Sequence, residues 1–282
     1  MRITILGSRG QIGAYLTEYL RKKGHQVTEF DKSNASWQDM TTIPNSALRS
    51  AISQSDFVFF LAFDVGGSRY LKKYQHTFNF IDNNARMLAG TVEYLNEYKT
   101  PFVFASSQMS NMSYSPYGVM KRVGELYTKS LGGLIVKFWN VYGIERDMEK
   151  AHVITDFIHK GFKTGHINMM TDGMEEREFL YAEDCCEALE KIMGCYDQFS
   201  STDELHITTG VSTNILEIAQ NIQSLFRSIG KEVKISPSSS KDEVQKDARN
   251  IPDPYIRKWW TPKTSIVDGI KKVFDEIKLE YL

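Results

Sequence analysis

The chain of 282 residues is long enough for one large domain or two smaller ones. Its 34 basic and 35 acidic residues nearly cancel, so there is no electrostatic reason to expect binding to nucleic acid or to an acidic membrane. No apolar run approaches the roughly 20 residues of a membrane span, and the first residues do not resemble a signal peptide. We therefore expect a cytoplasmic globular protein without a membrane segment.

Cysteine and histidine spacing gives no sign of a disulfide framework or a metal site. The three cysteines, Cys185, Cys186 and Cys195, are odd in number and form no CxxC pair. The histidines include no metal-spaced pair, and His152 is expected near the smaller lobe that the later part of the chain forms. We expect reduced core thiols, structural or surface histidines, and no bound metal.

Short apolar runs alternate with helical patterns along the chain. The runs are continuous and rich in β-branched or aromatic residues, which is typical of strands covered on both faces. They predict strands at 3–6, 26–30, 56–63, 101–106, 134–139 and 205–208. Amphipathic patterns predict helices at 11–24, 77–98 and 116–133, and near 151–163, 182–194, 213–228 and 263–278. This alternation predicts an α/β fold with a doubly wound parallel sheet.

The segment ILGSRGQIG places Gly7, Gly10 and Gly13 between the first strand and the first helix. Glycines at these positions allow a tight turn, close approach of the backbone to a diphosphate, and close packing of the helix on the strand. The helix N-terminus then offers free N–H groups to the phosphates. Asp31 ends the second strand, where its carboxylate can bind the ribose hydroxyls of adenosine and repel a 2′-phosphate. The sequence therefore predicts a dinucleotide site that prefers NAD.

Two charged residues leave alternatives open at this site. Arg9 lies inside the glycine turn and could reach a 2′-phosphate, which would favour NADP. Asp39 is expected where the third strand finishes, where it could meet the adenine edge or remain a solvated loop acid. The other residues expected to contact the cofactor are Gln11, Ile12, Met40, Leu61 and Ala62.

The segment YSPYGVMK carries Tyr117 and Lys121 four residues apart. Ser115 can cap a helix that begins at the following proline, which puts Tyr117 and Lys121 on one helix face. An ammonium near a phenol stabilises the phenolate, so we expect a lowered pKa for Tyr117. The run FVFASS brings Ser106 and Ser107 to the carboxyl end of a strand, where open α/β sheets bind ligands. A lone YxxxK pair is usually incidental, but with this serine and the dinucleotide turn it indicates catalysis.

These motifs resemble the extended short-chain dehydrogenases/reductases of the NAD-dependent epimerase/dehydratase family, whose members act on nucleotide sugars. The resemblance covers nearly the whole chain and implies a Rossmann-type fold with a smaller C-terminal substrate-binding lobe. Residues 1–140, with 180–209 returning to the sheet, would bind NAD, and 141–282 would mainly form the substrate lobe. It also implies that Ser107, rather than Ser106, binds the substrate, that Tyr117 is the base, and that Lys121 supports it and holds the cofactor ribose.

Further segments extend the resemblance toward the substrate. KFWNVYG (137–143) is similar to the family's R-x-x-N-x-Y-G segment, with Lys137 in place of arginine, and implies that Asn140 meets the substrate. REFLYAED (177–184) resembles a motif whose arginine, here Arg177, binds the nucleotide diphosphate. Arg249 matches a second diphosphate arginine more loosely. The WWTPKTSIVDGI segment (259–270) resembles the C-terminal signature.

The resemblance also covers the helix at 77–98, whose Asn84 would support the active site. In the family this helix and the Tyr117 helix build a homodimer interface, so we expect a homodimer.

The sequence departs from the family pattern near the expected chemistry. Family dehydratases carry an Asp-Glu pair beside the catalytic serine or threonine, whereas QMSN follows Ser107, which argues against a 4,6-dehydratase. The segment between Ser107 and Tyr117 is shorter than usual, and Phe63 replaces a small residue. We expect a nucleotide-sugar epimerase that oxidises the sugar at C4 and returns the hydride to its other face. The alternatives are a nucleotide-sugar 4-dehydrogenase or 4-keto-sugar reductase and, less favoured, a 4,6-dehydratase or a non-catalytic NAD-binding protein.

Overall fold

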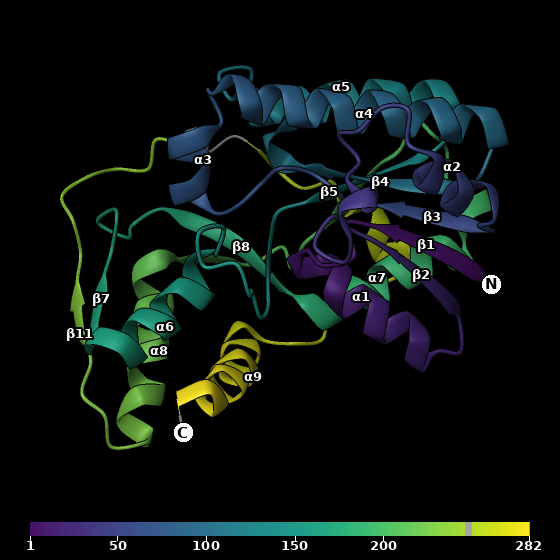
Figure 1. Cartoon of the computed structure of the whole chain (residues 1–282). Helices are drawn as coiled ribbons and strands as arrows, with labels where there is room; N and C mark the ends of the chain where they lie inside the picture. Colours follow the sequence, from purple (N-terminus) through teal and green to yellow (C-terminus); the bar gives the residue numbers. More distant parts are fainter. Residues whose placement is uncertain (246–249, 282) are drawn as a thin grey trace.

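A six-stranded parallel sheet forms the centre of the computed structural model, which describes residues 1–245 and 250–281 (Figure 1). Its strand order is β2 (Gln26–Phe30), β1 (Arg2–Leu6), β3 (Phe57–Phe60), β4 (Phe102–Ser107), β5 (Leu134–Phe138) and β9 (Glu204–Ile207). All of these neighbours pair in parallel, and β1 stands where the strand order reverses. The predicted Rossmann-type doubly wound sheet is confirmed, and its ligand site is expected at the carboxyl ends of the strands.

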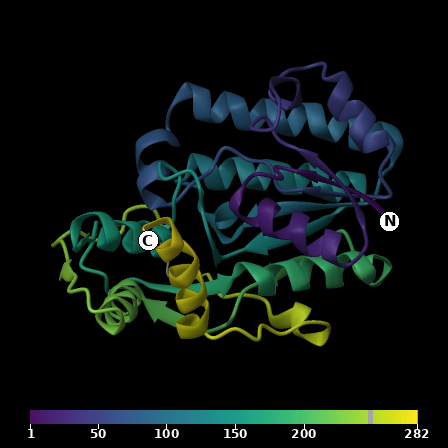
Figure 2. The same cartoon turned by 60° about the horizontal axis from the view of Figure 1, so that its bottom comes forward.

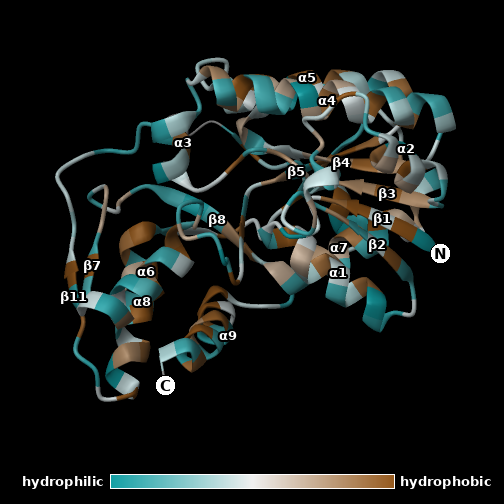
Figure 3. Ribbon diagram, in the orientation of Figure 1, coloured by the Kyte–Doolittle hydropathy of each residue, from teal (hydrophilic) through white to brown (hydrophobic). Residues whose placement is uncertain are grey.

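Helices cover both faces of this sheet (Figure 2). One face packs against α1 (Gln11–Lys22) and α7 (Ala182–Gly194), and the other packs against α2 (Ser46–Ser53), α4 (Phe78–Tyr98) and α5 (Pro116–Leu131). Each face has its own buried apolar cluster because the strand side chains alternate between the two faces. Figure 3 shows β3, in the middle of the sheet, as hydrophobic along its length, which fits burial on both faces.

A smaller group of elements lies beside the carboxyl ends of the strands (Figure 1). Three helices enclose a separate apolar core here, namely α6 (Val153–Thr164), α8 (Ile215–Ser228) and α9 (Ile266–Lys278). Its strands are β6 (Asn140–Tyr142), β7 (His166–Asn168), β8 (Glu176–Tyr181), β10 (Ser212–Asn214) and β11 (Lys234–Ser236). Strand β8 pairs with β6 and β10, while β7 pairs with β11. The chain enters this group directly from β5 through β6, so a cleft forms where the two cores meet.

The remaining elements are short. They are α3 (Ser68–Tyr74) and the 3₁₀ turns η1 (Ser36–Gln38), η2 (Gln108–Asn111), η3 (Tyr196–Gln198), η4 (Pro254–Lys258) and η5 (Leu279–Tyr281). In the described ranges, no helix is both long enough and apolar enough to cross a membrane.

Two expectations about the sheet need correction. The strand predicted at 56–63 ends at Phe60, because the next residues turn out of the sheet and pack on the glycine turn. A Cβ on Gly7 would lie only 2.7 Å from the backbone of Ala62, so this close approach requires glycine. The expected place of Asp39 at the end of the third strand is also wrong. Asp39 follows η1 in a loop, and the third strand begins only at Phe57.

Candidate active site

A cleft of about 2140 Å³ opens at the carboxyl ends of the central strands and continues toward the smaller group of elements. Nearly all the residues predicted from the sequence to form the site line this single cleft. They are Gly7, Arg9, Gly10, Gln11, Ile12, Gly13, Asp31, Asp39, Met40, Leu61, Ala62, Ser107, Tyr117, Lys121, Asn140 and Arg177. Arg249 lies outside the residues that the structure describes.

The glycine turn at one end of the cleft has the shape that a diphosphate needs. Gly7 has a φ of +86°, in the left-handed region that favours glycine. A Cβ on Gly13 would lie 2.1 Å from the carbonyl oxygen of Gly7, so the helix packs on the turn as closely as the sequence predicts. Helix α1 begins after Gly10 with no side-chain cap, which leaves its first N–H groups for a ligand. These residues fit the diphosphate of a dinucleotide.

The residues around Asp31 favour NAD over NADP. The carboxylate of Asp31 accepts hydrogen bonds from the backbone N–H groups of Arg9 (3.1 Å) and Ser33 (2.9 Å), which fix it at the end of β2. The Arg9 guanidinium donates to Asn34 Oδ1 (2.5 Å) and pairs with Glu29 (3.2 Å). Because a carboxylate already partners Arg9, this arginine is less available to a 2′-phosphate than its sequence position suggests.

Asp39 lines the same part of the cleft, but its carboxylate has partners of its own. Its Oδ1 accepts hydrogen bonds from the backbone N–H (2.9 Å) and the hydroxyl (2.7 Å) of Thr41. Its backbone carbonyl accepts a hydrogen bond from the Asn45 side chain (3.0 Å). These contacts give Asp39 a loop-stabilising role, and contact with an adenine edge remains a prediction.

Helix α5 starts as the sequence predicts and directs Tyr117 and Lys121 into the cleft. Ser115 Oγ accepts the Gly118 N–H (3.2 Å), which is the expected N-cap. A Cβ on Gly118 would lie 2.1 Å from the carbonyl oxygen of Met109, so the helix start rests directly on the turn after β4. This close approach brings Tyr117 near Ser107, whose hydroxyl acts to lower the Tyr117 pKa.

The expected lowering of the Tyr117 pKa is wrong for this structure. Burial raises the pKa of Tyr117 to about 12, and the nearby Ser107 hydroxyl offsets burial only in part. Lys121 is 3% exposed, and burial lowers its pKa to about 7, although the nearby Glu125 charge acts in the opposite direction. The Lys121 ammonium donates to the carbonyl oxygen of Ala105 (2.6 Å) rather than to the phenol. With its charge only partial and its N–H turned to the backbone, Lys121 does not bring the Tyr117 pKa below its ordinary value in this structure.

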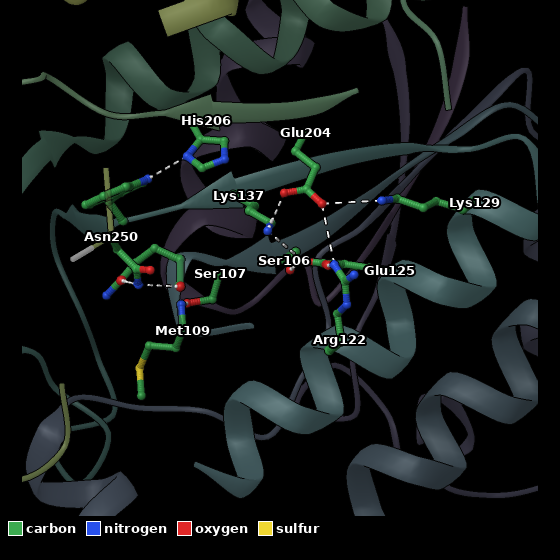
Figure 4. Close-up of polar contacts among 12 residues, drawn as sticks. Ser106, Ser107, Met109, Arg122, Glu125, Lys129, Lys137, Glu204, His206 and Asn250 are labelled. Carbon is green, nitrogen blue, oxygen red and sulfur yellow. Dashed lines mark hydrogen bonds and ion pairs between the residues drawn. The ribbon is translucent and has the colours of Figure 1, made fainter. Parts of the chain in front are cut away.

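Three α5 side chains, spaced four residues apart, hold three consecutive residues at the end of β4. Tyr117 lies near Ser107, and Lys121 donates a hydrogen bond to the carbonyl of Ala105. Glu125, one turn further along, accepts a hydrogen bond from Ser106 Oγ (2.5 Å) (Figure 4). Ser106 is therefore occupied by a buried carboxylate, which favours Ser107 as the serine that meets the substrate.

Lys137, which replaces the family's arginine, extends this network and stays out of the cleft. Its side chain is fully buried, and its ammonium lies 3.5 Å from Glu125 and 2.5 Å from Glu204 (Figure 4). Glu204 also pairs with Arg122 (3.5 Å) and Lys129 (3.3 Å) of α5. The network ties β5 and β9 to the helix that carries Tyr117, so Lys137 acts by positioning that helix.

The substrate end of the cleft is lined by residues from β6, β8 and the C-terminal segment. Asn140 donates to the carbonyl of Glu178 (3.4 Å). Arg177 forms an ion pair with Asp242 and donates to the carbonyl of Gln245 (3.3 Å), so its guanidinium is held at the cleft wall. A diphosphate would compete with Asp242 for this guanidinium.

The short segment after Ser107 is covered from the C-terminal side. Gln108 Nε2 donates to Gln245 Oε1 (3.0 Å), and Asn250 Nδ2 donates to Gln108 Oε1 (2.6 Å). Two residues from the C-terminal part of the chain therefore hold the segment after Ser107 in place.

One pair of cleft residues was missed by the sequence analysis. His152 Nδ1 lies 2.7 Å from Glu145 Oε1, and the His152 backbone N–H donates to Glu145 Oε2 (2.7 Å). Burial lowers the pKa of His152, but the Glu145 carboxylate overrides this effect and the pKa is raised. Both residues line the cleft, and none of the described residues hydrogen-bonds to Nε2 of His152. The only sign of this pair in the sequence is that Glu145 and His152 lie seven residues apart, shortly after the NVYG segment.

No group of three or more His, Cys, Asp or Glu side chains suited to a metal occurs in the part of the chain that the structure describes.

Comparisons with known proteins agree with the Rossmann-type fold. A UDP-N-acetyl-alpha-D-glucosaminuronate decarboxylase from Bacillus cytotoxicus is 26% identical over an alignment that covers 83% of each chain. Among solved structures, UDP-glucose 4-epimerase from Thermotoga maritima has a TM-score of 0.82 at 20% identity and 100% coverage of both chains. UDP-glucose 4-epimerase from Thermus thermophilus, solved with NAD, has a TM-score of 0.76 at 18% identity and 99% coverage of both chains. At these identities the two structures support the fold.

Residues 3–207 match the family described as the NAD dependent epimerase/dehydratase family. This match covers more than half of the chain and includes the glycine turn, Ser107, Tyr117 and Lys121. The chain belongs to the NAD-dependent epimerase/dehydratase family, whose cofactor is NAD.

Proposed function

We propose that this protein is an NAD-dependent nucleotide-sugar epimerase that oxidises the sugar at C4 and returns the hydride to the opposite face. One observation carries the proposal. Ser107, Tyr117 and Lys121 converge in a cleft that begins at the glycine turn, while Gln108 and Met109 stand where a dehydratase needs carboxylates. The cleft thus offers groups for proton transfer at a hydroxyl but no acid beside Ser107 to expel one as water.

The residues divide this chemistry among them. Ser107 donates a hydrogen bond to the oxygen of the reacting sugar hydroxyl, and Tyr117 accepts the proton from that oxygen. Tyr117 is a phenolate before it accepts this proton and a phenol afterwards, and Lys121, when charged, lowers the free energy of that phenolate and holds the ribose hydroxyls of the cofactor. Glu125 favours the charged form of Lys121, because its carboxylate raises the pKa that burial lowers. NAD, when bound, supplies the hydride acceptor at the sugar carbon.

Binding of the nucleotide-diphosphate sugar is assigned to the other end of the cleft. Arg177 is suited to the diphosphate because a guanidinium can bind two phosphate oxygens at once, with Asp242 as its partner before substrate arrives. Asn140 is assigned to the sugar, and Arg249 to the diphosphate on the strength of its motif alone.

A homodimer is part of the proposal. The outer faces of α4 and α5 expose an apolar set to solvent, with Phe78 76% exposed and Leu126 57% exposed. The other members of this set are Ile81, Val119 and Tyr127. Apolar side chains gathered on two adjacent helices favour burial against a second copy. This face is the one that the family uses for its four-helix dimer.

A second candidate function follows from Glu145 and His152. A histidine that lines the cleft, is paired to a carboxylate and has no hydrogen-bond partner for its other nitrogen among the described residues suits removal of a proton from carbon. Beside a 4-keto group such a carbon is acidic, so His152 could invert C3 or C5 rather than C4. This candidate keeps Tyr117 and NAD but changes which carbon is inverted.

Incubation with NAD and a panel of sugar nucleotides in D₂O, followed by mass spectrometry and NMR, tests both candidates. For C4 inversion we expect an isomer with no deuterium on carbon and no stoichiometric NADH, since the carbon-bound hydrogen is returned. Deuterium at C3 or C5 would support the His152 candidate. A product lighter by one water would contradict the proposal. A product lighter by two hydrogens, or a need for added NADH, would favour the 4-dehydrogenase or 4-keto-sugar reductase.

A further inference from the structure

Phe63 lies where the cofactor end of the cleft meets the catalytic residues. It is the third residue after β3, and its neighbour Ala62 packs against the backbone of Gly7. On the other side, Asn84 accepts the Asp64 N–H (2.7 Å) and donates to the Asp64 carbonyl (3.2 Å). The backbone on both sides of Phe63 is therefore fixed, and rotation about its side-chain bonds is the freedom left to the ring.

The Phe63 ring lies against the ammonium of Lys121. Lys121 Nζ is 3.7 Å from the centroid of the ring, a short cation–π contact, while the other rings near it are more than 5 Å away. The Phe63 ring also packs edge-on against Tyr117, with centroids 5.9 Å apart and planes at 76°. Lys121 is 3% exposed even though it lines a large cleft. The Phe63 ring thus covers the ammonium on the cleft side.

The ribose hydroxyls of the cofactor would approach the Lys121 ammonium from the cleft, which is the side that the Phe63 ring covers. A lysine ammonium has three N–H donors, and the carbonyl of Ala105 accepts one of them from the strand side (2.6 Å). Phe104, whose ring is 5.2 Å from Nζ, belongs to the core behind the lysine and does not line the cleft. Three rings lie near Lys121 Nζ, and one of them belongs to the catalytic Tyr117. Of the other two, Phe63 lines the cleft and Phe104 does not, so among the described residues Phe63 is the non-catalytic ring between the ammonium and the cleft.

We propose that Phe63 caps Lys121 and must swing aside when NAD binds, so that this side chain sets the affinity for the nicotinamide-ribose half of the cofactor. The inference rests on the proposed contact between Lys121 and the ribose. Loss of the cation–π contact then opposes NAD binding, whereas a ligand that fills only the adenosine end leaves the ring in place. Burial by the ring is also one cause of the low Lys121 pKa, since desolvation disfavours the charged form.

Calorimetric titration of the protein with NAD and with ADP, in the absence of any sugar nucleotide, tests the cap. Phe63→Ala should tighten NAD binding about 3- to 30-fold, the range that corresponds to a desolvated cation–π contact. ADP affinity should not change, because ADP lacks the second ribose. Phe63→Leu keeps an apolar cover without a π face and should give a smaller gain in NAD affinity.

Phe104→Leu is the matched control, since it removes a ring near Lys121 from the core side, and it should leave both affinities unchanged. Unchanged or weaker NAD binding in Phe63→Ala would overturn the cap, and so would equal tightening of NAD and ADP. If Phe63→Ala does not fold, the same test applies to Phe63→Leu: tighter NAD binding with unchanged ADP binding supports the cap, and unchanged or weaker NAD binding overturns it. Because no sugar is present, loss of the cap would leave the epimerase proposal standing, and failure of epimerisation would leave the cap standing.

Discussion

Lys121 should lower the free energy of unfolding, because burial of its amine disfavours the charged form. Its pKa falls from the ordinary 10.5 to about 7, so folding releases a proton from this side chain at neutral pH. The corresponding cost is about 4 kcal/mol at pH 7 and about 2 kcal/mol at pH 9, and it vanishes above the unfolded-state pKa. Replacing Lys121 with methionine removes this cost but leaves the Ala105 carbonyl without its hydrogen bond, a loss of about 1 kcal/mol.

We therefore expect Lys121→Met to raise the free energy of unfolding by about 3 kcal/mol at pH 7 and about 1 kcal/mol at pH 9. Urea unfolding of both proteins without added NAD, followed by circular dichroism at the two pH values, measures the difference. Lys129→Met removes a partly exposed lysine of the same helix and should show no such gain. A Lys121→Met protein less stable than wild type at pH 7, or a gain that does not shrink with pH, would refute the reasoning. The variant should also lose turnover and NAD affinity, which separates stability from function.

Three further substitutions test the assigned roles. Asp31→Ala should lower the ratio of NAD affinity to NADP affinity by about tenfold in titrations, because it removes the carboxylate that repels a 2′-phosphate. An unchanged affinity ratio would argue against the role of Asp31. Tyr117→Phe should lower turnover on the order of 10³-fold while NAD affinity stays within about twofold, and turnover within about tenfold of wild type would contradict its role as the base. Glu125→Gln removes the charge that raises the Lys121 pKa, so the high-pH limb of the rate profile should move to lower pH. Glu204→Gln keeps that charge and serves as its control, and equal shifts in both variants would contradict a specific role for Glu125.

Local patterns predicted the parts of the fold that depend on local chemistry. The helix at 182–194 and the strand at 26–30 have the predicted bounds, because an apolar face and clear end signals mark each of them. Strand β3 is shorter than its apolar run, because the residues after Phe60 are apolar for a different reason: they pack on Gly7 and Lys121. An apolar run reports burial, and it does not distinguish burial in a sheet from burial against a loop.

The candidate site was predictable where a motif has fixed spacing and unpredictable where partners are distant in sequence. Ser107 and Tyr117 lie in such motifs, and the structure places both in the cleft. The pairing of Arg177 with Asp242 joins residues 65 apart, and no local pattern announces it. The wrong expectation for the Tyr117 pKa has the same origin. Spacing put the ammonium near the phenol, but burial and a backbone carbonyl decide its charge and direction.

Helix α5 has a further consequence because its two faces serve different surroundings. Its inner face carries Tyr117, Lys121 and Glu125, and its outer face exposes Val119 (43%) and Leu126 (57%). A rigid helix cannot shift on one face and stay still on the other. In the proposed homodimer, a change at the outer face of α5 would therefore act on the helix that carries Tyr117. The contact between copies and the position of the catalytic tyrosine would then depend on one rigid helix.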